Sequence, residues 1–387
     1  MDKPKLVRIT TIPLSLFSLL KGQLKFMKNY FEVQAVTSNG ELIDSVRENE
    51  QVPVHTIEMT RKISPLKDIN ALWKMYKYLK KEKPLIVHTH TPKAGIVGML
   101  AAKIAGVPYR FHTVAGLPLL EVTGKTRILL NAVEKLTYSC ATHVYPNSFV
   151  LREILIKQGF AKEEKLKVIA NGSSNGIDTS YFDISNISEQ RINDLKKELN
   201  ISPEDFVFVF VGRLVGDKGL NEMVAAFERI QNLKNVKLLL VGPFESDLDP
   251  LKNETLKAIE ENKDIICVGF QKDVRPYFAI SDVLVFPSYR EGFPNVVMQA
   301  GAMGLPVIAS DINGCNEIIV EKENGLIIPV KDENAVYTAM VKLLEDKDLF
   351  NKLKSNARKM IVDRYEQKLV WQAILEEYKK VTGLHLE

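Results

Sequence analysis

An acidic and an amide side chain flank the start of a predicted helix within residues 288–304. Glu291 follows a strand-like run that ends at Pro287, Pro294 opens the helix, and Gln299 lies about one turn into it. Backbone N–H groups at a helix start can face a diphosphate. A carboxylate can grip sugar hydroxyls, and a polar side chain further along can reach a ribose. The segment therefore suits a sugar nucleotide.

A second candidate phosphate site follows the strand-like run Phe206–Val211. Its loop carries Arg213 and Lys218 among glycines, directly before a predicted helix. Arg213 offers a planar fork of donors and Lys218 a point charge, which suits a diphosphate whose charge grows as a bond breaks. A solvated basic loop explains this stretch alone equally well. The spacing is not that of a Walker loop.

A weaker candidate follows the next short strand. Gly269 and Phe270 stand where backbone groups would face the edge of a base. A plain strand end is the simpler explanation of this stretch.

Histidines mark two strand ends in the first half of the chain. His88 and His90 point the same way if their strand continues, but no third ligand is evident nearby, so no metal site is predicted. We expect them to form a polar cluster at the strand end. His112 ends the following strand, and its imidazole could accept a hydroxyl proton near neutral pH. A packed or capping histidine is the alternative.

These candidates need a scaffold, and strand-like and helix-like segments alternate along the whole chain. A length of 387 residues favours two domains. Alternating β and α segments predict an α/β fold with two open parallel sheets of Rossmann type. The predicted strands are Leu6–Thr10, Glu32–Thr37, Val52–Ile57, Leu85–His88, Tyr109–Thr113, His143–Tyr145, Lys167–Ala170, Phe206–Val211, Val236–Val241, Ile265–Val268, Val283–Pro287, Pro306–Ala309 and Gly325–Ile328.

The polar stretch Tyr181–Asp205 predicts the domain boundary. We therefore expect a first domain over 1–180, a second over 200–365, and a C-terminal helix over 366–387 that crosses back to the first domain.

Charge is distributed unevenly between the two halves. Residues 1–180 carry a balance of +11 and residues 181–387 one of −7, within a net charge of +4. Leu14–Lys28 and Leu66–Lys83 have the pattern of amphipathic helices rich in lysine. Ordinary surface helices are the simpler explanation, and peripheral docking to an anionic membrane is the functional one. Nucleic acid is not an expected partner, because no recognised binding module is present.

Several motifs, taken in order, resemble the retaining glycosyltransferases of family 4, which have the GT-B fold. They are Gly212-Arg213 with Lys218-Gly219, Val268-Gly269-Phe270, Pro287–Pro294 and Ala302–Val307, and they span the second domain. The resemblance implies two Rossmann-like domains whose parallel sheets face an interdomain cleft. It implies that Arg213 and Lys218 bind the nucleotide diphosphate without a metal ion and that Glu291 meets the donor sugar. It also implies that the backbone of Gly292, Phe293, Pro294, Asn295 and Val296 cradles sugar and phosphate.

The chain departs from the family pattern at one position. The family usually has a second glutamate that contacts the ribose hydroxyls, and Gln299 stands there. An amide both accepts and donates, so ribose binding remains but loses the assistance of a charge, worth about 1 kcal/mol. The first-half resemblance is looser. It sets His112 beside the donor sugar and matches Asn175, Gly176 and Asp178 to a segment that closes the first domain.

The predicted activity is therefore metal-independent retaining transfer of a hexose or N-acetylhexosamine from a nucleotide diphosphate sugar, with a UDP-sugar expected. The expected acceptor is a glycan on a lipid diphosphate carrier, in the synthesis of a bacterial surface polysaccharide. Pro13, Ser15 and Ser18 interrupt the apolar N-terminal run, so we expect a cytoplasmic enzyme, peripheral on the inner face of the membrane. A UDP-sugar 2-epimerase and a non-catalytic sugar-nucleotide-binding protein are the alternatives. No bound cofactor is predicted.

Overall fold

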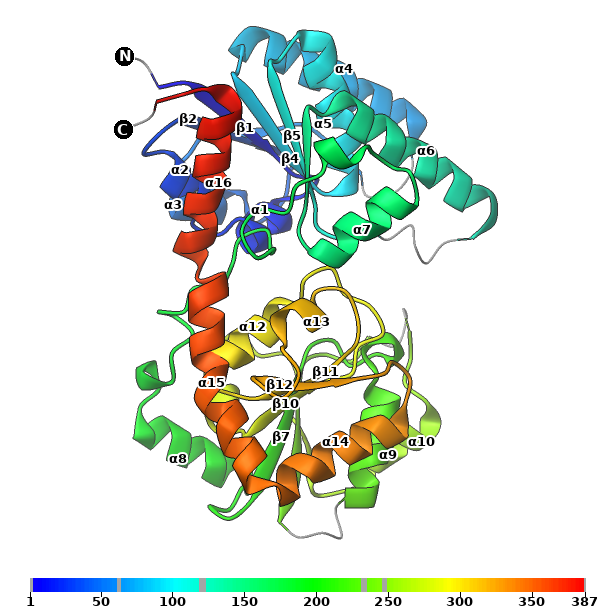
Figure 1. Cartoon of the computed structure of the whole chain (residues 1–387), viewed down its shortest axis with the longest axis vertical. Helices are drawn as coiled ribbons and strands as arrows, with labels where there is room; N and C mark the ends of the chain where they lie inside the picture. The colour runs from blue at the N-terminus through cyan, green and yellow to red at the C-terminus, as the bar shows by residue number, and fades with distance from the viewer. Residues whose placement is uncertain (1–2, 61–63, 118–122, 231–234, 246–248, 386–387) are drawn as a thin grey trace. The chain divides into compact units, whose positions relative to one another are not determined.

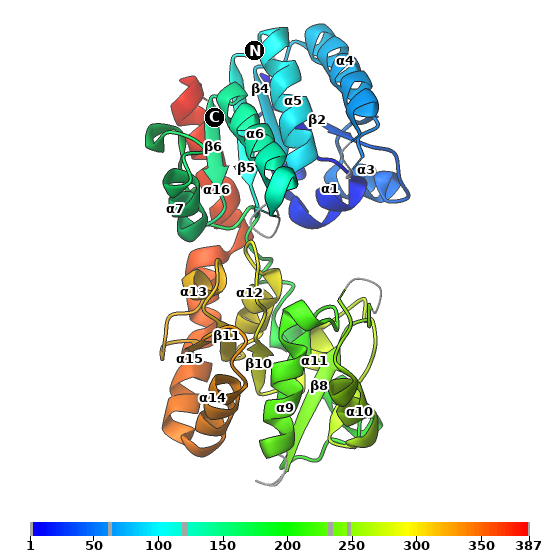
Figure 2. The same cartoon turned by 90° about the vertical axis from the view of Figure 1, so that its right-hand side faces the viewer.

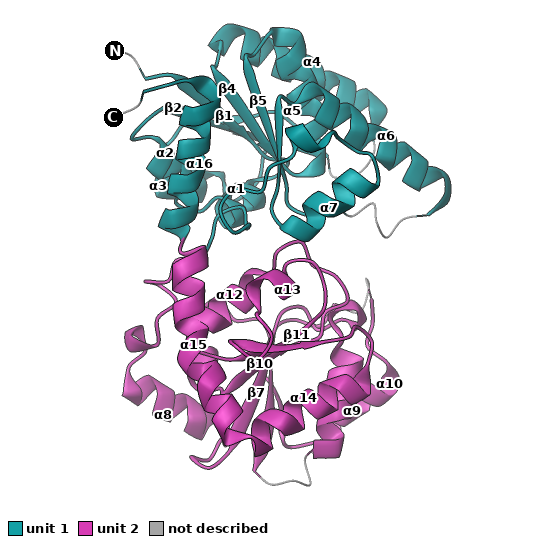
Figure 3. Ribbon diagram, viewed as in Figure 1, with its two compact units in different colours: residues 1–176, 367–387 teal, residues 177–366 magenta. Residues whose placement is uncertain are grey.

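The computed structural model describes residues 3–60, 64–117, 123–230, 235–245 and 249–385, which form two compact units (Figure 3). Unit 1 consists of Met1–Gly176 together with Gln367–Glu387, and unit 2 consists of Ile177–Glu366. The chain therefore passes from unit 1 to unit 2 and back again.

Unit 1 is built on a parallel sheet in the order β3-β2-β1-β4-β5-β6, with helices on both faces (Figure 1). This is the strand order of a dinucleotide-binding fold, and its direction reverses between β1 and β4. The strands are β1 (Lys5–Ile9), β2 (Glu32–Thr37), β3 (Val54–Thr56), β4 (Ile86–His90), β5 (Tyr109–Val114) and β6 (His143–Pro146).

Alternate residues of these strands enter two separate cores. Leu6 and Ile86 pack with the first-half helices α1–α3 and with α16, whereas Val7 and Val87 pack with α4–α7 on the other face. The helices are α1 (Pro13–Leu19), α2 (Gln23–Met27), α3 (Ile43–Glu50), α4 (Pro65–Glu82), α5 (Pro92–Ala105), α6 (Gly124–Cys140), α7 (Phe149–Lys157) and α16 (Gln367–Thr382). Helices α4, α5 and α6 lie side by side (Figures 1 and 2).

Unit 2 is also built on a parallel sheet, with the strand order β12-β11-β10-β7-β8-β9, and it has one continuous core. Its strands are β7 (Phe206–Val211), β8 (Val236–Val241), β9 (Ile265–Cys267), β10 (Val283–Phe286), β11 (Val307–Ser310) and β12 (Gly325–Ile328). Its helices are α8 (Glu189–Glu198), α9 (Leu220–Ile230), α10 (Asn253–Glu261), α11 (Arg275–Ala279), α12 (Asn295–Ala302), α13 (Cys315–Ile318), α14 (Glu333–Glu345) and α15 (Lys347–Tyr365). The predicted α/β class with two Rossmann-like sheets is confirmed.

Two local predictions are wrong. Lys167–Ala170 is not a strand, because the chain there makes only a single bridge, between Leu166 and Val144, before it turns. Leu14–Lys28 is not one helix, because it breaks at Gly22 into α1 and α2. Gly22 has φ +79°, and a Cβ there would come within 2.6 Å of the Trp371 ring.

Helix α16 completes unit 1 through a buried polar network as well as through apolar packing. Arg8 is fully buried, and its guanidinium donates to the Tyr378 hydroxyl at 2.8 Å and to Gln23 at 2.5 Å. The same guanidinium lies 2.7 Å from His90 Nε2, and His88 Nδ1 lies 2.5 Å from the Tyr378 hydroxyl. His88 and His90 thus form the expected polar cluster, anchored by a residue from the far end of the chain.

No helix within the described ranges is both long and apolar enough to cross a bilayer.

Candidate active site

The strand order of unit 2 brings two of the predicted loops together. Its direction reverses between β7 and β10, which is where open α/β sheets bind ligands. The loop after β7 carries Arg213 and Lys218, and the loop after β10 carries Glu291. The Tyr289 N–H donates to the Asp217 carbonyl at 2.9 Å, which fixes one loop against the other.

Lys218 and Glu291 form a direct ion pair across these loops. Lys218 Nζ lies 2.5 Å from Glu291 Oε1, and the two side chains are only 15% and 19% exposed. The buried Ser288 hydroxyl donates to the same oxygen at 3.2 Å. No described residue donates to Glu291 Oε2. One carboxylate oxygen is thus held in place, and the other keeps its capacity for a ligand hydroxyl.

A glycine makes the close approach of the two loops possible. Gly219 precedes helix α9 with φ +72°, and a Cβ there would lie 2.2 Å from the Pro287 carbonyl oxygen. Any other residue would push the loops apart and separate Lys218 from Glu291.

Arg213 belongs to a second contact, between the loops after β7, β8 and β9. A Cβ on Gly242 would lie 1.7 Å from the Gly212 carbonyl oxygen, and the Gly242 N–H donates to the Gly269 carbonyl at 2.9 Å. Arg213 is paired with Glu245 at 2.9 Å and keeps 42% of its side chain exposed. Phe270 is 74% exposed, so this edge of the sheet offers both a cation and an aromatic face.

The segment around the start of α12 has its backbone fixed by a residue that the sequence analysis missed. Asn313 donates its side-chain amide to the Gly292 carbonyl at 2.5 Å and to the Glu291 carbonyl at 3.3 Å. Asn313 follows β11, so its place at a strand end was the available signal. Pro294 is the N-cap of the helix and Gln299 is half-buried within it. The predicted residues gathered in this segment are Gly292, Phe293, Pro294, Asn295, Val296 and Gln299.

His112 lies in unit 1, where its ring is packed in the interior. The residue is 2% exposed, Nδ1 lies 2.7 Å from the Thr89 hydroxyl, and a Cβ on Gly95 would lie 2.6 Å from the ring. Burial lowers the pKa of His112 to about 4. A group this buried and this weakly basic fits a packing role better than that of a general base near pH 7.

We expect this burial to make the fold sensitive to acid. A histidine whose folded-state pKa is lowered binds its proton more tightly when unfolded, so its contribution is intact above pH 6.5 and is lost as the pH falls toward 4. For His112 the loss between pH 7 and pH 5 is about 2 kcal/mol. His88 and His90, whose pKa values burial also lowers, act in the same direction.

The free energy of unfolding from urea titrations at pH 7 and pH 5 checks this prediction. His112→Asn should reduce the difference between the two values. An unchanged difference in that variant would show that the acid sensitivity arises elsewhere.

Two family models match the chain over most of its length. "Glycosyl transferase 4-like domain" matches residues 27–172, and "Glycosyl transferases group 1" matches residues 191–360. The chain is 32% identical to CapM of Staphylococcus aureus, a capsular polysaccharide biosynthesis glycosyltransferase, over 98% of this chain and 97% of that protein.

Two further comparisons agree. The chain is 32% identical to an Escherichia coli UDP-Gal:α-D-GlcNAc-diphosphoundecaprenol α-1,3-galactosyltransferase, over 85% of this chain and 82% of that protein. Its fold matches the crystal structure of Anabaena HepE in complex with UDP, with a TM-score of 0.81 and 20% identity, over 97% of this chain and all of the other. The chain therefore belongs to the GT-B glycosyltransferases of family 4, of the bacterial cell-surface polysaccharide type.

Proposed function

We propose that this glycosyltransferase moves a hexose or N-acetylhexosamine from a UDP-sugar to a lipid-linked glycan acceptor, with retention and without a metal ion. The observation that supports it most is the Lys218–Glu291 pair, in which a cation and a carboxylate with one uncommitted oxygen stand on adjoining loops. A cation can hold a diphosphate while a carboxylate holds the hydroxyls of the sugar attached to it.

In the proposed reaction, Lys218 and Arg213 stabilise the leaving diphosphate. The bond from the anomeric carbon to the diphosphate oxygen breaks, and its electron pair stays on the diphosphate. The acceptor hydroxyl attacks from the same face and passes its proton to that diphosphate. Two preorganised cations lower the cost of the charge that develops there. Glu291 orients the sugar, and Gly269 with Phe270 meets the base.

The roles of the remaining parts are assigned in the same proposal. Residues 1–180 with the helix 366–387 bind the acceptor, and residues 200–365 bind the nucleotide sugar. His112 positions β5 and α5 rather than accepting a proton. The acceptor assignment draws on two relatives named for diphosphoundecaprenol substrates, the E. coli galactosyltransferase and a Campylobacter jejuni N-acetylgalactosaminyltransferase. An acceptor of this kind places the enzyme at the inner face of the cytoplasmic membrane.

Turnover assays test this proposal. Purified protein with EDTA is incubated with individual UDP-sugars, with and without a prenyl-diphosphate-linked sugar, and UDP release and the product's anomeric configuration are measured. We expect UDP release that depends on the acceptor and an α-linked product from an α-linked donor. Epimerised donor without acceptor would favour the epimerase, and binding without turnover would favour a non-catalytic protein.

Gln299→Glu should tighten nucleotide binding. The carboxylate would accept from both ribose hydroxyls with charge assistance, which is worth about 1 kcal/mol, or about a fivefold lower Kd for UDP. Calorimetric titration with UDP measures this, with Gln158→Glu as the control, because Gln158 of unit 1 is exposed and its side-chain oxygen accepts from Arg127 at 2.8 Å. An equal or weaker affinity in Gln299→Glu would remove Gln299 from the ribose site.

A further inference from the structure

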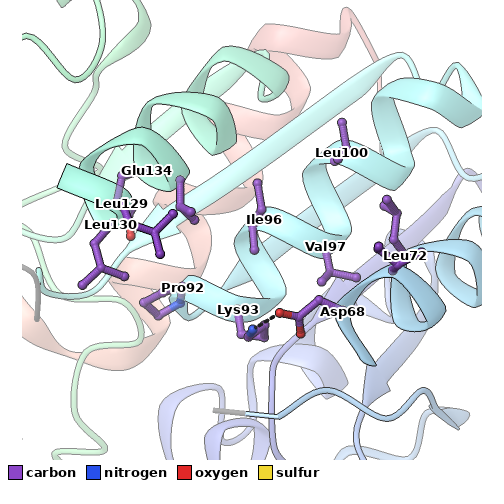
Figure 4. Close-up of a pocket in the computed structure, with 12 residues that line it drawn as sticks. Asp68, Leu72, Pro92, Lys93, Ile96, Val97, Leu100, Leu129, Leu130 and Glu134 are labelled. Atoms are coloured by element: carbon purple, nitrogen blue, oxygen red, sulfur yellow. Dashed lines mark hydrogen bonds and ion pairs between the residues drawn. The ribbon is translucent and has the colours of Figure 1, made fainter. Parts of the chain in front are cut away.

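Unit 1 contains an apolar pocket that the donor chemistry leaves unused. It has a volume of about 290 Å³ and lies between helices α4, α5 and α6 (Figure 4). Its aliphatic lining includes Leu72, Ile96, Val97, Leu100, Leu130 and Val133. The size is close to the lower limit of small-ligand pockets, so it fits a narrow apolar group.

The lining has three charged side chains, and two of them pair with each other. Lys93 Nζ lies 2.6 Å from Asp68 Oδ2, and the two side chains are 12% and 24% exposed (Figure 4). The third, Glu134, is 7% exposed, and burial raises its pKa. The rest of the lining is almost entirely aliphatic, which suits an apolar occupant.

The pocket lies toward one edge of the unit 1 sheet. Helices α4, α5 and α6 each connect two strands of the parallel sheet, so the first half of each helix lies near the edge at which the preceding strand ends. The lining of the pocket comes mainly from these first halves. The pocket consequently lies toward the edge at which the strands end, which is the ligand-binding edge of such sheets.

Exposed apolar side chains carry the lining of the pocket out to the surface. Ile69 and Leu129, which line it, are 63% and 48% exposed. These side chains complement a hydrocarbon chain.

We propose that this pocket binds the first part of the prenyl chain of the lipid-linked acceptor. The inference rests on the proposed function and adds a binding site for the hydrocarbon part of its substrate. A protein does not need a concave cavity to bind a flat bilayer surface. It does need one to bind a single prenyl chain that leaves the bilayer. The exposed leucine and isoleucine side chains border the path by which such a chain enters.

A pair of matched substitutions on α5 tests the site. Ile96→Trp fills the pocket, and Ile104→Trp adds the same ring two turns further along, at a residue that is 58% exposed and outside the pocket. For each variant, kcat/KM is measured with a long-chain polyprenyl-diphosphate acceptor and with a short-chain analogue of the same head. Thermal unfolding verifies that each variant is folded.

Ile96→Trp should lower the preference for the long-chain acceptor at least about tenfold, or about 1.4 kcal/mol, and Ile104→Trp should leave it as in the wild type. An unchanged preference in Ile96→Trp would overturn the proposal. An equal loss of this preference in both variants would overturn it too. The same holds if Ile96→Trp loses binding to anionic vesicles without prenyl lipid to the same extent, because the pocket would then bind the bilayer itself.

Direct binding separates this inference from the proposed function. Retention of a labelled polyprenyl diphosphate in detergent micelles is measured for the wild type and both variants without any donor. If no sugar is transferred but Ile96→Trp alone loses the label, the pocket stands and the proposed function fails. If sugar is transferred and all three proteins bind the label equally, the function stands and the pocket assignment fails.

Discussion

Lys218→Ala is expected to lower kcat for sugar transfer by about 100- to 1000-fold, the usual cost of removing one preorganised donor from a developing negative charge. Lys218 is 15% exposed and lies 2.5 Å from Glu291. The variant also leaves the Glu291 carboxylate unpaired in a half-buried site. Single-turnover rates with saturating UDP-sugar measure the effect on the chemical step.

The chain provides a matched control for this substitution. Lys237 on β8 pairs with Asp264 at 2.6 Å, and the two side chains are 17% and 26% exposed, yet Lys237 is near the opposite end of its strand from the loops of the site. Lys237→Ala should leave transfer within about twofold of the wild type. A Lys218→Ala rate equal to that of Lys237→Ala would exclude Lys218 from the reaction.

Glu291→Gln should separate sugar binding from nucleotide binding. The amide preserves the shape of the side chain but weakens its grip on hydroxyls and its pairing with Lys218, so we expect kcat/KM to fall about 100-fold or more. The Kd for UDP alone should change little, because UDP lacks the transferred sugar that Glu291 would meet. Calorimetry with UDP and with the UDP-sugar, beside steady-state kinetics, checks both parts.

Asp264→Asn is the control, since it removes the same charge from the matched pair. If Glu291→Gln weakened UDP and UDP-sugar equally, Glu291 would act on the phosphates through Lys218 and not on the sugar.

The local features of the candidate site could be predicted from the sequence, because each lies in one short loop. Arg213, Lys218 and Glu291 all follow buried strands, and the α/β alternation places such loops at one edge. The ion pair itself depends on β7 lying beside β10, and no local pattern specifies which strands are neighbours. Asn313 was missed because its contact is to a backbone carbonyl 21 residues away, in the loop after the preceding strand.

Two differences between expectation and structure in unit 1 have the same physical origin. The periodicity of residues 14–28 suits one helix, but Trp371 fills the space beside Gly22 and the chain turns there. His112 has the right position for a base, yet its burial depends on the packing of Gly95 and Thr89 from other elements. Long-range packing overrides local pattern in both places.

The return of the chain to unit 1 through α16 also bears on how the protein is made. Val370, Leu375 and Tyr378 complete one core of that unit, and Tyr378 partners the fully buried Arg8. On the ribosome these residues appear only after the whole of unit 2, so an unfinished unit 1 exposes an apolar face and an unmatched cation throughout that time. Domains of a nascent chain commonly fold from the N-terminus onward. Here the domain that starts first is the one that finishes last.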